Sequence, residues 1–139
     1  MDLSSKIELN NLRHTIRYGL QPDEPSLLSV WLEKDTAVLQ QGSSVTERRR
    51  VHVRQFELLL DTIADELVAA NWRQLCLDQI YKPLAALAKI TNDEMSTRHL
   101  VKLRHELAVT AQYYENSISN GQKKNFEKRN TNESDANRE

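Results

Sequence analysis

The chain has 139 residues and a formal net charge of −1, from 19 basic and 20 acidic side chains. This length suits one domain with a single hydrophobic core, and the balanced charge gives no overall bias toward nucleic acid or anionic membranes. Cys76 is the only cysteine, which excludes an intramolecular disulfide. The start of the chain has no signal-peptide pattern, and no apolar run approaches the roughly 20 residues that span a bilayer, so we expect a cytoplasmic protein without membrane contact.

Two amphipathic helices are predicted before Gly42. The first runs from about Leu3 to Tyr18 and is followed by Gly19, a residue type that favours helix ends. Two prolines disfavour helix over residues 21–25, because proline lacks an amide hydrogen and restricts the residue before it. The second helix runs from about Ser26 to Gln41. Hydrophobic spacing places on the buried faces of these helices Leu3, Ile7, Leu12, Ile16, Leu28, Trp31, Leu32 and Leu39.

The longest predicted helix begins at Ser44 and reaches about Lys82. Ser44 and Glu47 have capping-box spacing, in which each side chain satisfies a backbone amide of the first turn. After Asn71 the hydrophobic pattern weakens, so residues 72–87 are either a continuation or a separate fourth helix, with Pro83 as a kink or a new start. The apolar stripe contains Val53, Phe56, Leu60, Ile63, Ala64 and Leu67, followed by Leu75, Ile80, Tyr81 and Leu84.

A last helix is predicted from about Asp93 to Ser119, and a polar segment follows it. From Asn120 onward, Phe126 is the only large apolar residue, so the segment buries too little surface to offset its conformational entropy. We therefore expect an all-α bundle of four or five amphipathic helices in residues 1–119 and a disordered, flexible polar tail in residues 120–139. The apolar stripe of the last helix contains Leu100, Leu103, Leu107, Ala111, Tyr114 and Ile118.

The third predicted helix carries a charge gradient opposite to its dipole. Basic residues crowd its first turns and acidic residues follow, although a helix dipole favours acids at its amino end by roughly 0.3–1 kcal/mol per exposed charge. A complementary acidic group outside the helix would offset this cost. Guanidinium groups bind carboxylates and phosphates in a bidentate manner, so the basic cluster is the candidate partner-binding surface. This cluster consists of Arg48, Arg49, Arg50, His52 and Arg54.

A second copy of the chain is one source of the complementary acid. Two of these helices packed antiparallel would place the basic cluster of one copy against the acidic section of the other, which predicts a homodimer. Two apolar residues assigned to the charged face would add hydrophobic contact. The expected dimer contacts are Val51, Leu58, Glu57, Asp61 and Asp65.

The remaining reactive residue types form no strong site pattern. His14, His52, His99 and His105 include no pair at the four-residue spacing that puts two imidazoles on one helix face, and Cys76 has no cysteine partner. We therefore expect no metal site, and the chain carries no cofactor fingerprint.

One enzymatic motif lies in the last predicted helix. Arg98 and His105 are seven residues apart, which places them near one helix face. The run from Arg98 to His105 resembles the arginine-spacer-histidine motif of HEPN ribonucleases, which are also small helical proteins. This resemblance implies RNA cleavage by the arginine and the histidine, usually across a dimer. His99 stands where the family often has another polar residue.

The leading interpretation is a small non-enzymatic adaptor or regulatory protein that needs no cofactor and acts through protein–protein contacts. Its partner would be another protein or a second copy of itself, bound in a groove between helices or on the charged face. The first alternative is a nucleic-acid-binding factor that uses the Arg48–Arg54 basic cluster. Arg98, Lys102 and Lys123 would join that cluster if the third and last helices are neighbours. A HEPN-like ribonuclease is a more remote alternative.

Overall fold

The computed structural model describes the backbone of residues 2–136 and the side chains of residues 2–120. Its elements are α1 (Leu3–Tyr18), α2 (Ser26–Thr36), α3 (Val45–Ala64), α4 (Ala70–Gln79), α5 (Tyr81–Lys89) and α6 (Glu94–Ala136). Ile80 alone separates α4 from α5, so these two helices form one kinked arm. The predicted all-α bundle is confirmed, because every element in the described residues is a helix. The predicted tail, residues 120–139, falls almost entirely on residues whose side chains lie outside the described part.

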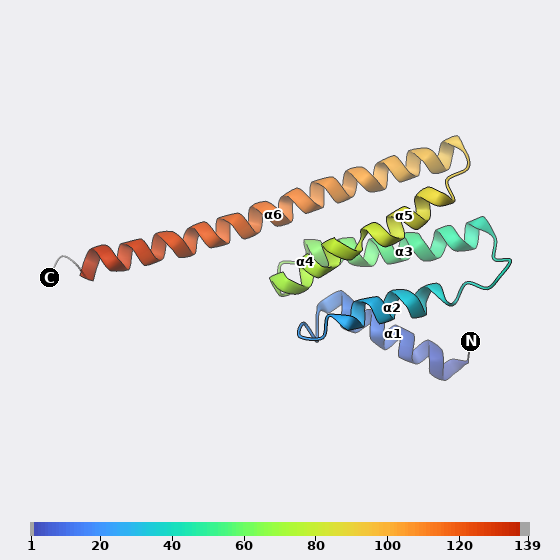
Figure 1. Ribbon diagram of the computed structural model, residues 1–139, viewed down its shortest axis with the longest axis horizontal. Coiled ribbons are helices and arrows are strands. Elements are labelled where there is room, and N and C mark those ends of the chain that lie inside the picture. The colour runs from blue at the N-terminus through green and yellow to red at the C-terminus, as the bar shows by residue number, and fades with distance from the viewer. Residues whose placement is uncertain (1, 137–139) are drawn as a thin grey trace.

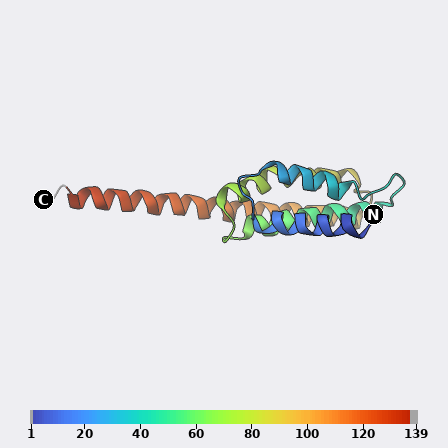
Figure 2. The ribbon, with the colours of Figure 1, turned by 90° about the horizontal axis from the view of Figure 1, so that it is seen from below.

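Helix α3 is the centre of the bundle and packs against every other helix. The helices form two layers, with α2 and the α4–α5 arm in one and α1, α3 and α6 in the other (Figure 2). In the view of Figure 1, α5 lies above α3 and α2 lies below it, so α2 and α5 are spaced apart from each other. The core between the layers is centred on large side chains without solvent exposure, namely Trp31, Phe56, Leu59, Ile63 and Ile80.

The predicted helix starts agree closely with the structure. The Ser44 side chain accepts a hydrogen bond of 3.1 Å from the Glu47 amide, so α3 begins with the expected serine cap. Before α6, Asp93 Oδ1 accepts from the Ser96 amide at 2.7 Å and Ser96 Oγ accepts from the Asp93 amide at 3.1 Å. These hydrogen bonds satisfy backbone amides that have no partner within the helix, and the bond from Ser96 lowers the pKa of Asp93.

The prediction of one helix from Ser44 to Lys82 is wrong, because α3 ends at Ala64, and the alternative of a separate helix after Asn71 is closer to the structure. Asp65 is extended, and its side chain accepts a hydrogen bond of 3.0 Å from the Leu67 amide, which stabilises a turn in place of the next helical residues. Leu67 is consequently 97% exposed instead of buried. Pro83 has no amide hydrogen for the Gln79 carbonyl, which accounts for the kink between α4 and α5.

Several predicted burials and one predicted helix end are also wrong. Leu3 and Ile7 are exposed because they lie on the opposite side of α1 from Leu9 and Ile16, which face the core. Tyr81 is exposed at the start of α5. Helix α2 ends at Thr36, five residues before the predicted end.

Gly19, in the α1–α2 connection, packs closely against the α3–α4 connection and the start of α4. Its φ of 58° is left-handed, and a Cβ atom added there would lie 2.8 Å from Val68 Cγ1 and 3.0 Å from Trp72 Cδ1. Trp72 Nε1 donates a hydrogen bond of 2.9 Å to the Ile16 carbonyl. The carboxyl end of α1 therefore rests on the turn between α3 and α4, and only glycine fits at the contact.

Gly19→Ala should destabilise the fold more than Gly42→Ala. Both glycines have positive φ, but nothing lies within 4 Å of a Cβ atom at Gly42, so only Gly19 adds a steric clash to backbone strain. We expect a loss of about 2–4 kcal/mol in the free energy of unfolding for Gly19→Ala and about 1 kcal/mol for Gly42→Ala. Urea denaturation measures both, and equal losses would contradict the close contact.

Candidate functional site

A groove runs between α2 and α5 over the exposed edge of α3. It consists of two cavities of 460 and 670 Å³ that share Thr36, His52 and Lys82. Each helix contributes residues at spacings of three or four, which places them on one helix face. Apolar residues line much of this surface, namely Leu32, Ala37, Leu39, Pro83, Ala85, Ala86 and Ile90.

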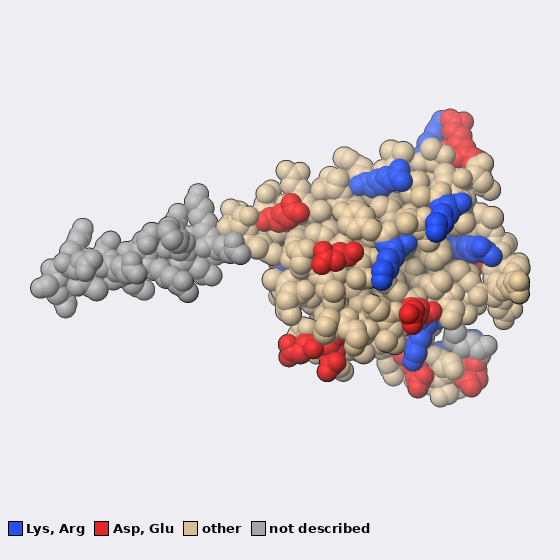
Figure 3. Space-filling model, viewed as in Figure 1, with Lys and Arg blue, Asp and Glu red and all other residues tan. Residues whose placement is uncertain are grey.

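Positive charge dominates the polar lining of the groove. Arg48 from α3 and Lys82 and Lys89 from α5 line it, against one carboxylate, Glu33 from α2. None of these three cations forms an ion pair with a side chain in residues 2–120. In Figure 3, basic side chains gather over α5 and the adjoining end of the bundle, while acidic ones lie mainly toward the opposite end and the lower edge. The groove is therefore an apolar trough with basic walls.

Gln55 fixes the position of His52 at the edge of the groove. The buried Gln55 amide donates a hydrogen bond of 3.0 Å to Thr36 Oγ1, which ties α3 to α2. His52 Nδ1 lies 3.0 Å from Gln55 Oε1, and this contact orients the imidazole and leaves Nε2 as its second polar atom.

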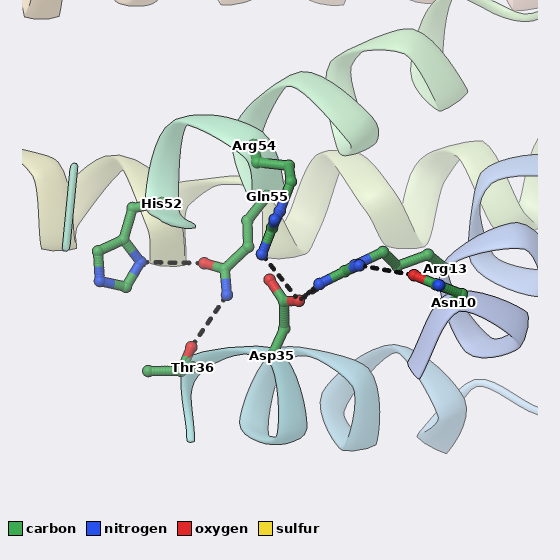
Figure 4. A network of polar contacts seen from close by, with 7 residues as sticks. All are labelled: Asn10, Arg13, Asp35, Thr36, His52, Arg54 and Gln55. Carbon is green, nitrogen blue, oxygen red and sulfur yellow. Dashed lines mark hydrogen bonds and ion pairs between the residues drawn. The ribbon is translucent and has the colours of Figure 1, made fainter. Parts of the chain in front are cut away.

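A buried carboxylate behind the groove holds three helices together (Figure 4). Asp35 from α2 is fully buried, and its Oδ1 accepts from Arg13 Nε of α1 at 3.2 Å. Arg54 Nη2 of α3 lies 3.5 Å from the same oxygen. Arg13 also donates to Asn10 Oδ1 at 3.0 Å, which orients the guanidinium. Two arginines thus neutralise one buried carboxylate, as burial of a charge requires.

The structure disperses the predicted basic cluster instead of gathering it on one surface. Arg54 pairs with Asp35, and Arg49 donates a hydrogen bond of 3.4 Å to the Ile90 carbonyl at the end of α5. Arg48 and His52 line the groove, whereas Arg50 is exposed and makes no hydrogen bond or ion pair with a described side chain. Only two of the five predicted partner-binding residues therefore belong to the candidate site.

Three of the expected dimer contacts serve the chain itself. Val51 is buried and Leu58 packs against the core, so neither is the exposed apolar residue that the hypothesis assumed. Asp65 Oδ2 accepts a hydrogen bond of 2.9 Å from Arg17 Nη1, which lowers the pKa of Asp65. Glu57 and Asp61 are exposed, and the antiparallel α3 dimer itself stays a prediction.

The HEPN-like pair lies on the solvent side of α6. Arg98 is exposed and forms an ion pair with Glu94 one turn earlier, and His105 is exposed. Neither residue lines any of the cavities described between the helices. Within the residues that the structure describes, no group of three histidine, cysteine or acidic side chains could hold a metal ion.

Comparison with known proteins gives no match to a protein family, to a curated protein or to a solved structure. None of the helices in the described residues is both long and apolar enough to cross a lipid bilayer.

Sequence reasoning missed Asp35, Gln55, Lys82 and Lys89, although three of these residues leave a signal. Asp35 continues the spacing of Leu28, Trp31 and Leu32, which places a carboxylate on the buried face of α2. Lys82 and Lys89 are seven residues apart, which places both on one face of α5. That α5 lies beside α2 and α3 follows from the tertiary structure and has no sequence signal.

Asp35→Asn should destabilise the bundle more than Arg54→Gln. The first substitution removes the buried charge that Arg13 and Arg54 share, but both arginines are partly exposed and can hydrate, so we expect a loss of about 1–3 kcal/mol. Arg54 is about half exposed, and its loss should cost less than about 1 kcal/mol. Chemical denaturation measures both variants, and a neutral Asp35→Asn would contradict the role of this carboxylate.

The Cys76 thiol should resist alkylation in the folded protein. Burial raises its pKa to about 12, so the reactive thiolate is scarce at neutral pH and reagents cannot reach the sulfur. Iodoacetamide should modify Cys76 slowly in native protein and rapidly in urea, as mass spectrometry would show. Rapid native alkylation would mean that α4 opens readily.

Proposed function

We propose that this protein is a small non-enzymatic adaptor or regulator that binds an acidic, amphipathic segment of a partner protein in the groove between α2, α3 and α5. The observation that carries this proposal is the combination of an apolar lining with three cations that lack an ion-pair partner among the described side chains. An amphipathic helix buries its apolar face in such a groove, and its acidic flanks then meet the basic walls.

The distribution of charge supports a protein partner over nucleic acid. Phosphate backbones are bound by several cations on one surface, and binding strength follows the number of neutralised phosphates. Arg49 and Arg54 are engaged within the chain, while Arg98 and Lys102 lie on α6 and do not line the groove. Glu33 adds a carboxylate to the groove wall. The groove is therefore more complementary to a segment with both apolar and acidic side chains than to a phosphate backbone.

A synthetic peptide with leucine and glutamate at helical spacing tests the groove directly. We expect the fluorescein-labelled peptide to bind, and charge reversal in Lys82→Glu with Lys89→Glu to weaken binding about tenfold, because two favourable contacts become repulsive. Fluorescence anisotropy gives the dissociation constants. Lys102→Glu is the matched control, since Lys102 is exposed on α6 outside the groove and should leave binding unchanged.

A steric variant tests occupancy of the groove independently of charge. Ala85 is exposed and lines the groove from α5, so Ala85→Trp should block the peptide without disturbing the core. Two results would contradict the proposal. One is equal weakening by Lys102→Glu, and the other is tighter binding of labelled duplex DNA that is lost steeply with added salt.

A further inference from the structure

The end of the bundle away from the α2–α3 connection exposes apolar side chains. The α1–α2 and α3–α4 connections meet there (Figure 1), and Gly19 packs against Val68 and Trp72. Leu20 and Leu67 are the sequence neighbours of this contact, and both are exposed. Tyr18 and Tyr113 add exposed rings at the same end. We refer to Tyr18, Leu20, Leu67 and Tyr113, with the acidic residues of the two connections, as the acidic end.

The turn that presents Leu67 is held on both sides. Asp65 accepts hydrogen bonds from the Leu67 amide at 3.0 Å and from Arg17 at 2.9 Å. Glu66 accepts a hydrogen bond of 2.8 Å from the Tyr113 hydroxyl. Leu67 is therefore fixed in an exposed position, and little conformational entropy is lost when a partner covers it.

Acidic residues alone supply the charge of these two connections. The connections, residues 19–25 and 65–69, contain Asp23, Glu24, Asp65 and Glu66 but no lysine or arginine. Arg17, at the end of α1, pairs with Asp65 and lies over the Tyr18 ring. Only Asp65 among these acids forms an ion pair with a described side chain. The opposite charge gathers over α5 and the other end of the bundle, as Figure 3 shows. An apolar surface with an acidic border therefore lies on the same molecule as an apolar groove with basic walls.

We propose that the acidic end of one copy binds in the groove of a second copy. Leu67 and Leu20 would occupy the apolar lining, while Asp23, Glu24 and Glu66 would face Arg48, Lys82 and Lys89. This inference rests on the groove of the proposed function and names its partner. The contact joins two different surfaces, so it is heterologous, and repeated contacts build open chains or larger rings of copies instead of an isologous dimer.

Light scattering coupled to size-exclusion chromatography tests this arrangement on the full chain. The weight-average mass of the wild-type protein should rise continuously with concentration and fall when salt is added. Leu67→Asp should be monomeric, and so should Lys82→Glu with Lys89→Glu, since each variant removes one of the two surfaces. Met95→Asp is the matched control, because Met95 is another largely exposed apolar residue, on α6 and outside both surfaces.

Mixing the two monomeric variants gives the sharpest result. The Leu67→Asp variant keeps its groove and the lysine variant keeps its acidic end, so the mixture should form a complex of one copy of each and grow no further. Circular dichroism checks that both variants are folded, which is expected because all three side chains are exposed. A mixture that stays monomeric would overturn the proposal.

Two other results would also overturn it. A wild-type mass that reaches a plateau at the dimer would show a closed pair, as the antiparallel α3 arrangement predicts. A wild-type protein that is monomeric at every concentration would show that the two surfaces do not bind each other. The acidic peptide separates the two proposals: if it binds monomeric Leu67→Asp, the groove function stands, and if it does not, that function fails as well.

Discussion

The dipole of α3 and the charges at its two ends set how the neighbouring helices pack against it. Arg49, in the first turns of α3, reaches the Ile90 carbonyl at the carboxyl end of α5, where the dipole of that helix favours a cation. At the other end of α3, the buried Arg73 of α4 donates a hydrogen bond of 2.8 Å to the Ile63 carbonyl. At each end of α3, therefore, an arginine binds a carbonyl at the carboxyl end of a helix: Arg49 binds that of α5, and Arg73 binds that of α3 itself.

Buried polar side chains of α3 then fix the positions of α1 and α2. The single hydroxyl hydrogen of Thr62 is shared between the Arg17 carbonyl at 3.2 Å and the Leu58 carbonyl at 2.8 Å, and Gln55 donates to Thr36 of α2. A buried polar group that loses its partner costs about 1–3 kcal/mol, so these bonds favour one register of the helices over sliding alternatives. The position of α2 beside α3, and with it one wall of the groove, follows from this register.

The sequence contains enough information for the local features and too little for the groove. The bounds of α1, the serine cap of α3 and the buried stripe of α6 follow from residues close together in the chain, and all three are confirmed. The end of α3 was missed because Leu67 continues the hydrophobic spacing of the helix. The turn depends instead on hydrogen bonds from distant residues: Arg17 binds Asp65 from 48 residues away, and Arg73 binds the Ile63 carbonyl from 10 residues away. Lys82 and Lys89 join Arg48 only through packing of α5 beside α3.

Adjacent arginines of α3 have different roles because successive helical residues point about 100° apart. Arg48 faces the groove, whereas Arg49 holds the end of α5 and Arg54 neutralises Asp35. Removal of the whole basic cluster would therefore lower stability and alter the groove together, and lost binding could not be assigned to either cause. The lysines of α5 form no ion pair with a described side chain. Their substitution therefore changes the charge of the groove without removing an ion pair within the bundle, whereas substitution of the α3 arginines changes both.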